Sequence, residues 1–143
     1  MTSNKLSGRV LRFALPKGSL EKSTFTLFEK AGFRLYIGAR SYHPGCDDRE
    51  LDFVMYRPQE MPRYVEDGIV DAGLTGYDWV VENQSRVVRI CDLTYSKQTS
   101  NPVRWVLAVH ESSNVRSVKD LAGKKIATEL VNVTRRYLAK KHV

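Results

Sequence analysis

The chain has 143 residues, a length that suits one domain or one domain with part of a second. Its 42% apolar and 27% charged residues describe a globular protein and exclude a disordered or fibrous one, and its formal net charge is +7. The sequence contains no apolar run near the roughly 18 residues of a membrane span, so membrane binding is not expected. Its polar first nine residues contain no signal core, and its two cysteines have no metal-type spacing. A cytoplasmic location is therefore expected.

In the first part of the chain, apolar runs typical of buried strands alternate with segments of helical periodicity. Strands are expected at residues 10–15, 33–37, 51–56, 69–74 and 87–91, and helices at 20–31, 58–67 and 77–82. Ser19 is expected to cap the first helix and Gly32 to end it, and the turn-rich residues 38–50 are expected to form a loop. This alternation predicts a mostly parallel α/β sheet.

The polar residues 94–102, which end in Asn-Pro, are the best candidate for a hinge. Beyond them we expect strands at 103–109 and 125–128 and helices at 117–121 and 131–141. Two strands rarely make a stable unit. The predicted organisation is therefore a first α/β lobe over 1–95, a hinge over 96–103 and the start of an incomplete second lobe over 104–143.

Positive charge is concentrated in the second part of the chain. Residues 101–143 carry nine Lys or Arg and three Asp or Glu, a net charge of +6. Such a segment suits a nucleic acid, a membrane surface or a phosphorylated metabolite, but on charge alone a solvated helix face with a few lysines at strand ends is the favoured explanation. Because aromatic side chains are not interleaved with these charges, nucleic-acid binding is the weaker interpretation.

Two loops have the residue types of anion-binding sites. Residues 15–20 (LPKGSL) and 71–78 (DAGLTGYD) each join a predicted strand to a predicted helix. Glycine allows a close backbone approach to a ligand, and the free N–H groups at a helix start favour anions. The alternative is that each loop only caps its helix, with Lys17 exposed and Asp71 capping a turn.

In the second part, residues 118–128 (VKDLAGKKIAT) lead from a short helix through a glycine to a strand end at Thr128 and Glu129. Lys124 and Lys125 are more consistent with a structural role, and Arg104 is either a phosphate ligand or a rim residue. The three histidines are scattered and have no metal or relay spacing.

The order of four segments resembles that of the ATP phosphoribosyltransferase family. They are LPKGSL at 15–20, ARSY at 39–42, RPQEMPRYVEDGIVDAGLTGYDWVVE at 57–82 and LAGKKIATELVNVTRRYL at 121–138. The resemblance implies two α/β lobes, a fold similar to that of the type II periplasmic binding proteins, with the second lobe incomplete here. It implies that ATP and phosphoribosyl pyrophosphate condense to phosphoribosyl-ATP and pyrophosphate in histidine biosynthesis, with Mg²⁺ carried by the substrates' phosphates.

The resemblance also implies substrate-binding residues. They are Lys17, Gly18, Ser19, Arg40, Ser41, Asp71, Gly73, Thr75, Gly76, Tyr77, Arg104, Thr128 and Glu129. Lys17 to Ser19 would lie at the cleft floor, Arg40 and Ser41 near the nucleotide, and Arg104 would face in from the second lobe. Many family members have arginine where this chain has Ser19, which removes one expected cation.

The family continues with a Gly/Thr-rich loop that binds the phosphoribosyl pyrophosphate phosphates, whereas this sequence ends before it. We therefore expect a fragment that is inactive alone and forms a homo-oligomer, with a regulatory subunit as a further candidate partner. The alternative to a fragment is a truncated gene product whose function need not be that of the family. The alternative function is a periplasmic-type module that binds a small molecule without catalysis.

Overall fold

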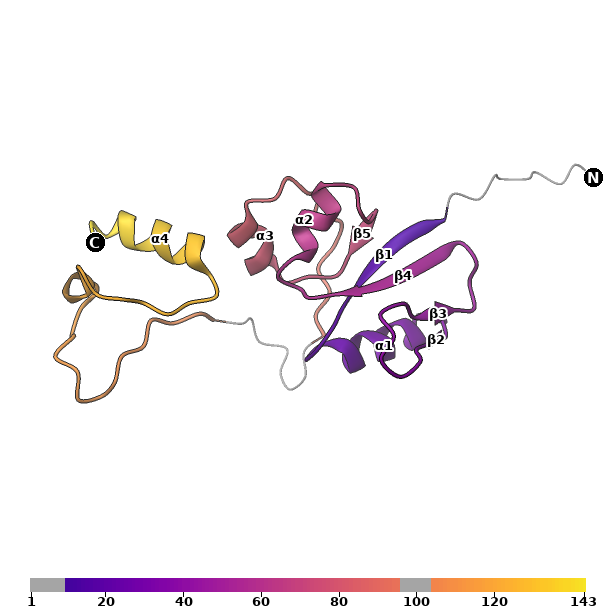
Figure 1. Cartoon of the computed structure of the whole chain (residues 1–143), viewed down its shortest axis with the longest axis horizontal. Helices are drawn as coiled ribbons and strands as arrows, with labels where there is room; N and C mark the ends of the chain where they lie inside the picture. Colours follow the sequence, from indigo (N-terminus) through magenta and orange to yellow (C-terminus); the bar gives the residue numbers. More distant parts are fainter. Residues whose placement is uncertain (1–9, 96–103) are drawn as a thin grey trace, which may run out of the picture.

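The computed structural model describes residues 10–95 and 104–143 (Figure 1). In chain order the elements are β1 (Leu11–Pro16), α1 (Glu21–Lys30), β2 (Leu35–Tyr36), β3 (Gly45–Cys46), β4 (Leu51–Tyr56), α2 (Met61–Glu66), β5 (Ala72–Gly73), α3 (Tyr77–Asn83), the 3-10 helix η1 (Val118–Leu121) and α4 (Val131–Lys140). The expected hinge, residues 96–103, lies outside the described residues.

A three-stranded parallel sheet of order β4-β1-β5 organises the first part of the chain. β1 pairs with β4 along its whole length, from Leu11 opposite Leu51 to Pro16 opposite Tyr56, and with the short β5 at Phe13 and Ala14. The prediction of a parallel α/β sheet is confirmed here. Because all three strands run the same way, the loops that follow them leave from one end of the sheet.

The apolar runs of β1 and β4 bury both faces of the sheet, since successive side chains in a strand point in opposite directions. Leu15, Phe53 and Met55 lie on the face that α1 covers, where Phe28 meets Phe53 edge to face with ring centroids 5.2 Å apart. On the opposite face, which α2 covers, Ala14 packs with Met61 and Val70 (Figure 1).

A small antiparallel hairpin of β2 and β3 lies beside α1 (Figure 1). Residues 38–50, expected to be a loop throughout, thus contain the two-residue strand β3, which pairs with part of the expected 33–37 strand. The loop between them returns to the sheet edge, where the Met55 N–H donates to the Tyr42 carbonyl at 2.7 Å. This bond continues the pairing of β4 on its outer side.

The C-terminal region, residues 104–143, contacts the first part of the chain through α3. The Glu82 carboxylate, 8% exposed, accepts hydrogen bonds from the backbone N–H groups of Asn132 at 2.8 Å and Val133 at 2.9 Å, in the first turn of α4. At the other end of α3, Trp105 Nε1–H donates to Asp78 at 3.0 Å, and its ring lies edge to face with Trp79. A carboxylate at the amino end of a helix complements both its free N–H groups and its dipole.

Several expected elements differ in the structure. The described residues of the expected strands 87–91, 103–109 and 125–128 form no strand, and the 69–74 strand shrinks to Ala72–Gly73. A strand needs a neighbouring strand for its backbone hydrogen bonds, and within the described residues these segments pair with no strand. Ser19 was wrongly expected to cap α1, because Leu20 occupies that position and no side chain caps the helix.

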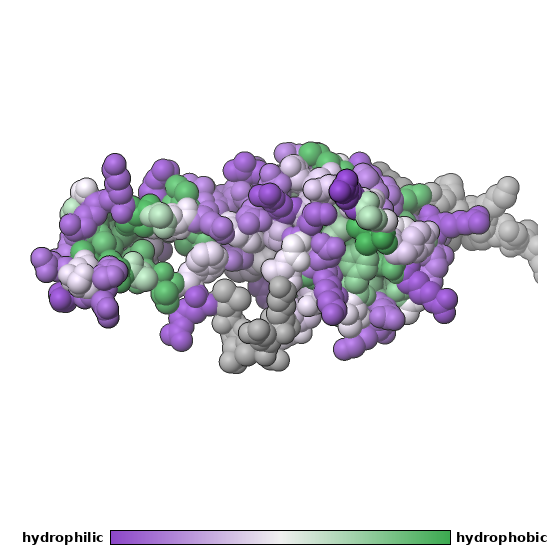
Figure 2. Space-filling model, turned by 60° about the horizontal axis from the view of Figure 1, so that its bottom comes forward, coloured by the Kyte–Doolittle hydropathy of each residue, from purple (hydrophilic) through white to green (hydrophobic). Residues whose placement is uncertain are grey.

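As a result, apolar side chains of these segments lie at the surface. Val88, Ile90 and Val106 are 84%, 85% and 72% exposed. Figure 2 shows apolar surface in the C-terminal region, next to strongly hydrophilic side chains. Across residues 10–95 and 104–143, no helix has both the length and the apolar character that crossing a membrane requires.

Candidate functional site

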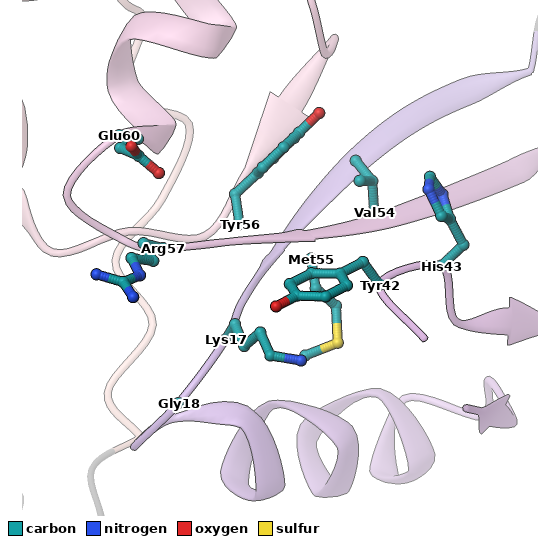
Figure 3. Close-up of a pocket in the computed structure, with 9 residues that line it drawn as sticks. All are labelled: Lys17, Gly18, Tyr42, His43, Val54, Met55, Tyr56, Arg57 and Glu60. Carbon is teal, nitrogen blue, oxygen red and sulfur yellow. The ribbon is translucent and has the colours of Figure 1, made fainter. Parts of the chain in front are cut away.

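A hollow of about 540 Å³ lies at the carboxyl end of β1 and along the end of the edge strand β4 (Figure 3). Nine residues from the β1–α1 loop, the 38–44 loop, β4 and the β4–α2 loop line it: Lys17, Gly18, Tyr42, His43, Val54, Met55, Tyr56, Arg57 and Glu60. Ligands of open parallel sheets bind at this end of the strands.

The LPKGSL loop reaches the hollow because β1 ends in it. The Lys17 N–H donates to the Tyr56 carbonyl at 2.8 Å, so the chain stays tied to β4 for one residue past the strand. It then turns at Gly18, whose φ of +101° favours glycine. Lys17 and Gly18 line the hollow as expected, whereas the exposed Ser19 is not among its lining residues.

The Lys17 ammonium and the Tyr42 ring are in contact. Lys17 Nζ lies 3.9 Å from the centroid of the ring, within the range of a cation–π interaction. Both side chains lie on the side of β4 on which Met55 projects, whereas Tyr56 and Val54 project from the other side (Figure 3). The hollow therefore contains a cation that lies against an aromatic ring.

At the far end of the hollow, the loop between β4 and α2 carries Arg57 and Glu60 (Figure 3). This loop is braced by the β5–α3 connection and by the last residue of α3. The Thr75 hydroxyl donates to the Pro58 carbonyl at 2.7 Å, and Asn83 Nδ2 donates to the Gln59 carbonyl at 2.7 Å. Thr75 thus supports the β4–α2 loop that forms one wall of the hollow, without lining the hollow itself.

Residues 74–76 of the DAGLTGYD segment follow β5, the neighbour of β1, so the topology places them at the same end of the sheet as Lys17. Thr75, Gly76 and Tyr77 are nevertheless not among the lining residues of the hollow. The Asp78 carboxylate lies at the start of α3 and accepts from Trp79 N–H and Trp105 Nε1–H. A carboxylate at this position opposes a second anion there.

Asp71 and Gly73 have structural partners. The Asp71 carboxylate accepts from the backbone N–H of Arg12 at 2.9 Å and from its guanidinium, and these interactions raise the pKa of Arg12. A Cβ on Gly73 would lie 2.7 Å from Met61 Sδ, so glycine allows α2 to pack closely on β5. Their expected substrate contacts stay predictions.

Of the ARSY segment, residues 39–42, only Tyr42 lines the hollow. Arg40 is exposed, with a φ of +64°, and neither it nor Ser41 lines the hollow. The Ser41 hydroxyl accepts from the His43 N–H at 3.1 Å and so shapes the turn that presents Tyr42 and His43.

The expected residues of the second lobe lie outside the hollow. Arg104 is exposed at the start of the C-terminal region, and Glu129 is exposed before α4. The Thr128 hydroxyl accepts from the Leu130 N–H at 3.0 Å and contacts the Thr134 hydroxyl, so it shapes the entry to α4. The structure does not bring these three residues to Lys17.

Sequence reasoning missed five polar or aromatic lining residues: Tyr42, His43, Tyr56, Arg57 and Glu60. Two signals could have found some of them. Tyr42 completes the ARSY motif, and Arg57 and Glu60 open the longest of the family-like segments, directly after a predicted strand. Polar residues at that position of a parallel sheet are candidates on topology alone.

The charges of the hollow favour an anionic ligand. Lys17 and Arg57 are cations, and among the nine lining residues Glu60 is the only carboxylate. The Tyr42 ring offers flat apolar surface beside Lys17. No group of three or more His, Cys, Asp or Glu side chains within the described ranges is arranged to hold a metal ion.

Fold and site together define a mixed α/β protein with a parallel sheet and a basic hollow at its carboxyl edge. A family model described as HisG, ATP phosphoribosyltransferase, matches residues 57–143. The ATP phosphoribosyltransferase of Desulforudis audaxviator is 58% identical over 129 residues, which are 90% of this chain and 45% of that protein. The enzyme of the same name from Pelodictyon phaeoclathratiforme is 58% identical over 135 residues, 94% of this chain and 46% of that protein.

Among solved structures, the ATP phosphoribosyl transferase (HisG:HisZ) complex from Thermotoga maritima is similar, with a TM-score of 0.51 and 26% identity over 59% of this chain and 40% of that one. The chain belongs to the ATP phosphoribosyltransferase family. It spans less than half the length of these curated relatives.

Proposed function

We propose that this chain contributes the first part of the catalytic region of an ATP phosphoribosyltransferase. The reaction joins a ring nitrogen of ATP to the anomeric carbon of phosphoribosyl pyrophosphate, forming phosphoribosyl-ATP and releasing pyrophosphate. The observation that carries the proposal is the basic hollow around Lys17, found in a chain of this family at the sheet end where ligands bind.

In this proposal the hollow binds phosphate groups of a substrate. Lys17 and Arg57 supply positive charge, and Gly18 lets the backbone approach closely. A displacement between two polyanions needs little covalent help from the protein, so positioning and charge balance account for most of the catalysis. With one carboxylate in the hollow, magnesium is better carried by the substrates' phosphates than held by the chain.

The proposal includes a second lobe that closes over the hollow in the whole protein, as in the two-lobed type II periplasmic binding proteins. The exposed apolar segments of the C-terminal region are consistent with a lobe whose sheet needs further strands. The similarity to a HisG:HisZ complex also makes association with further subunits part of the proposal.

The test is binding of ATP and of phosphoribosyl pyrophosphate, each with magnesium, to the purified chain by calorimetry. We expect dissociation constants in the micromolar to millimolar range. Lys17→Ala should weaken binding of one of these substrates about tenfold or more, because a charged hydrogen bond to phosphate is lost.

Lys30→Ala is the matched control, since this exposed lysine lies at the other end of α1 and outside the hollow. Equal affinity of the Lys17→Ala and Lys30→Ala variants for both substrates would contradict the proposal. That the 143-residue chain releases no pyrophosphate on its own stays a prediction.

A further inference from the structure

We infer that Tyr42 is a positioning residue for the proposed anion site, acting through Lys17, and this inference rests on the function proposed above. The two side chains come from loops 25 residues apart in the sequence and meet over the end of β4 (Figure 3). Their contact, 3.9 Å from Nζ to the ring centroid, is the geometry that carries the inference.

Each partner is held by its backbone to β4, on opposite edges of that strand. The Lys17 N–H donates to the Tyr56 carbonyl at 2.8 Å, and the Tyr42 carbonyl accepts from the Met55 N–H at 2.7 Å. Successive residues of a strand direct their backbone groups to opposite sides. Lys17 therefore bonds to Tyr56 on the side of β4 that faces β1, and Tyr42 bonds to Met55 on the outer side of this edge strand. Their side chains then meet beside Met55, which is 1% exposed and gives them an immobile base.

A free lysine side chain samples many rotamers, and fixing it on a ligand costs conformational entropy. The ring face of Tyr42 attracts the ammonium and holds it in the hollow before a phosphate arrives. One side of the ammonium then faces the ring, and its remaining N–H donors are available for an anion. Tyr42 therefore raises anion affinity without needing to contact the anion.

The loop around Tyr42 is built to present the ring. Ser41 accepts from the His43 N–H and closes the turn, and Pro44, directly after it, is buried. Tyr42 is 53% exposed, so burial of apolar surface accounts for only part of its position. The contact of its ring face with the Lys17 ammonium supplies a further reason for that position.

The first part of the experiment measures the contact without any ligand. Protons near a ring face are shifted upfield in the NMR spectrum, so the Lys17 side-chain protons of the wild-type chain should be shifted upfield. Tyr42→Phe, which keeps the ring face, should retain this shift, and Tyr42→Leu should abolish it. An unshifted Lys17 in the wild type, or a shift that persists in Tyr42→Leu, would overturn the inference.

The second part measures binding of inorganic pyrophosphate by calorimetry. Tyr42→Leu should weaken it about two- to fivefold, the strength of an exposed cation–π contact, and Tyr42→Phe should bind as the wild type does. In a Lys17→Ala background, Tyr42→Leu should have no further effect. Tyr137→Leu, a change of an exposed tyrosine on α4, is the matched control and should leave affinity unchanged.

The outcomes separate the inference from the proposed function. Equal loss in Tyr42→Phe and Tyr42→Leu would assign the effect to the hydroxyl and overturn the positioning role. A twofold or larger loss from Tyr42→Leu in the Lys17→Ala background would do the same. If Lys17→Ala binds pyrophosphate, ATP and phosphoribosyl pyrophosphate as the wild type does, the proposed function fails. The role of Tyr42 in anion binding then fails with it, even if the upfield shift shows that the two side chains are in contact.

Discussion

Residues 10–95 and residues 104–143 contain comparable hydrophobic runs, but the two regions differ strongly in strand pairing and in the burial of those runs. In the first region, β1 and β4 pair along six residues and are covered on both faces by helices. In the second, the strand-like residues 104–109 stay unpaired and exposed, and the region contacts the rest of the described chain through α3. An apolar run becomes a strand only where another strand lies beside it, so a similar pattern leads to two outcomes.

The difference also separates the functional elements. The hollow around Lys17 depends on backbone bonds within the first region, so it is assembled without the second. The C-terminal region is held through the ring contact of Trp79 with Trp105 and a few polar contacts, of which the buried Glu82 carboxylate makes two with α4. We therefore expect substitutions in the first region to change global stability or ligand affinity, and substitutions in the second region or at its contacts with α3 to have smaller, local effects.

The largest expected effect is loss of the core of the first region. Phe53→Ala removes a buried ring that contacts Phe13 and Phe28 and should destabilise the chain by about 3–5 kcal/mol. Thermal unfolding followed by circular dichroism measures this effect. Val106→Ala, at a residue that is 72% exposed, is the control and should change the unfolding midpoint little. A similar loss of thermal stability in both variants would show that Val106 is packed against other residues, in contrast to the structure.

Removal of the Glu82 carboxylate should detach the second region and leave the first folded. Glu82→Ala leaves the Asn132 and Val133 amides without their acceptor, at a cost of about 1–3 kcal/mol. The chain's two tryptophans, Trp79 and Trp105, are in contact, so their fluorescence should shift to the red on detachment. Glu66→Ala, at the exposed end of α2, should leave the emission unchanged. Unchanged emission in Glu82→Ala would show that other contacts hold α4.

Loss of the Thr75 hydroxyl should loosen the wall of the hollow. Thr75→Val removes the donor to the Pro58 carbonyl and should cost about 0.5–1.5 kcal/mol. Because Thr75 supports the loop that carries Arg57 and Glu60, ATP affinity should fall together with stability. Chemical denaturation and calorimetry on the same samples measure both. A loss of affinity at full stability would instead assign Thr75 a direct contact with ligand, as the sequence resemblance implies.

The smallest effect concerns the start of η1 in the second region. Hydrogen bonds from the Arg116 and Ser117 N–H groups lower the pKa of the exposed Asp120. A lowered pKa in the folded state means that the charged form stabilises this turn. That contribution is complete above the ordinary aspartate pKa of about 3.9 and disappears as the pH falls through the lower folded value.

An NMR titration of the Asp120 carboxyl group and the Ser117 amide should show a midpoint below the ordinary aspartate pKa. Asp120→Asn should remove the pH dependence of the Ser117 amide. A midpoint at the ordinary aspartate value would show that the turn is not formed in solution.

The sequence predicted the helices better than the strands. Helical periodicity and terminal glycines such as Gly32 are local, and α1, α3 and α4 lie within a few residues of the expected ranges. Strand pairing is a long-range property. The apolar residues 87–91 and 104–109 satisfy the local pattern, but the sequence carries no local sign that a partner strand is beside them.

The candidate site divides in the same way. Lys17 and Gly18 were predictable because a strand, a glycine and a helix follow one another directly in the sequence. Tyr42 and His43 were missed because a bond between Tyr42 and the distant Met55 brings their loop to the sheet edge. The loop residues around Thr75 had the composition of a ligand loop, yet the Pro58 carbonyl accepts the Thr75 hydroxyl.

Hydrogen exchange of the wild-type chain, with and without ATP and magnesium, tests this contrast most directly. We expect slow exchange in β1, β4 and the first turn of α4, and unprotected exchange over residues 104–110 and 125–128. ATP should slow exchange around Lys17, Gly18 and Tyr42 and leave residues 104–128 unchanged. Slow exchange over 104–110 without ligand, or ATP protection confined to residues 104–143, would contradict both the fold described for the second region and the site assigned to the first.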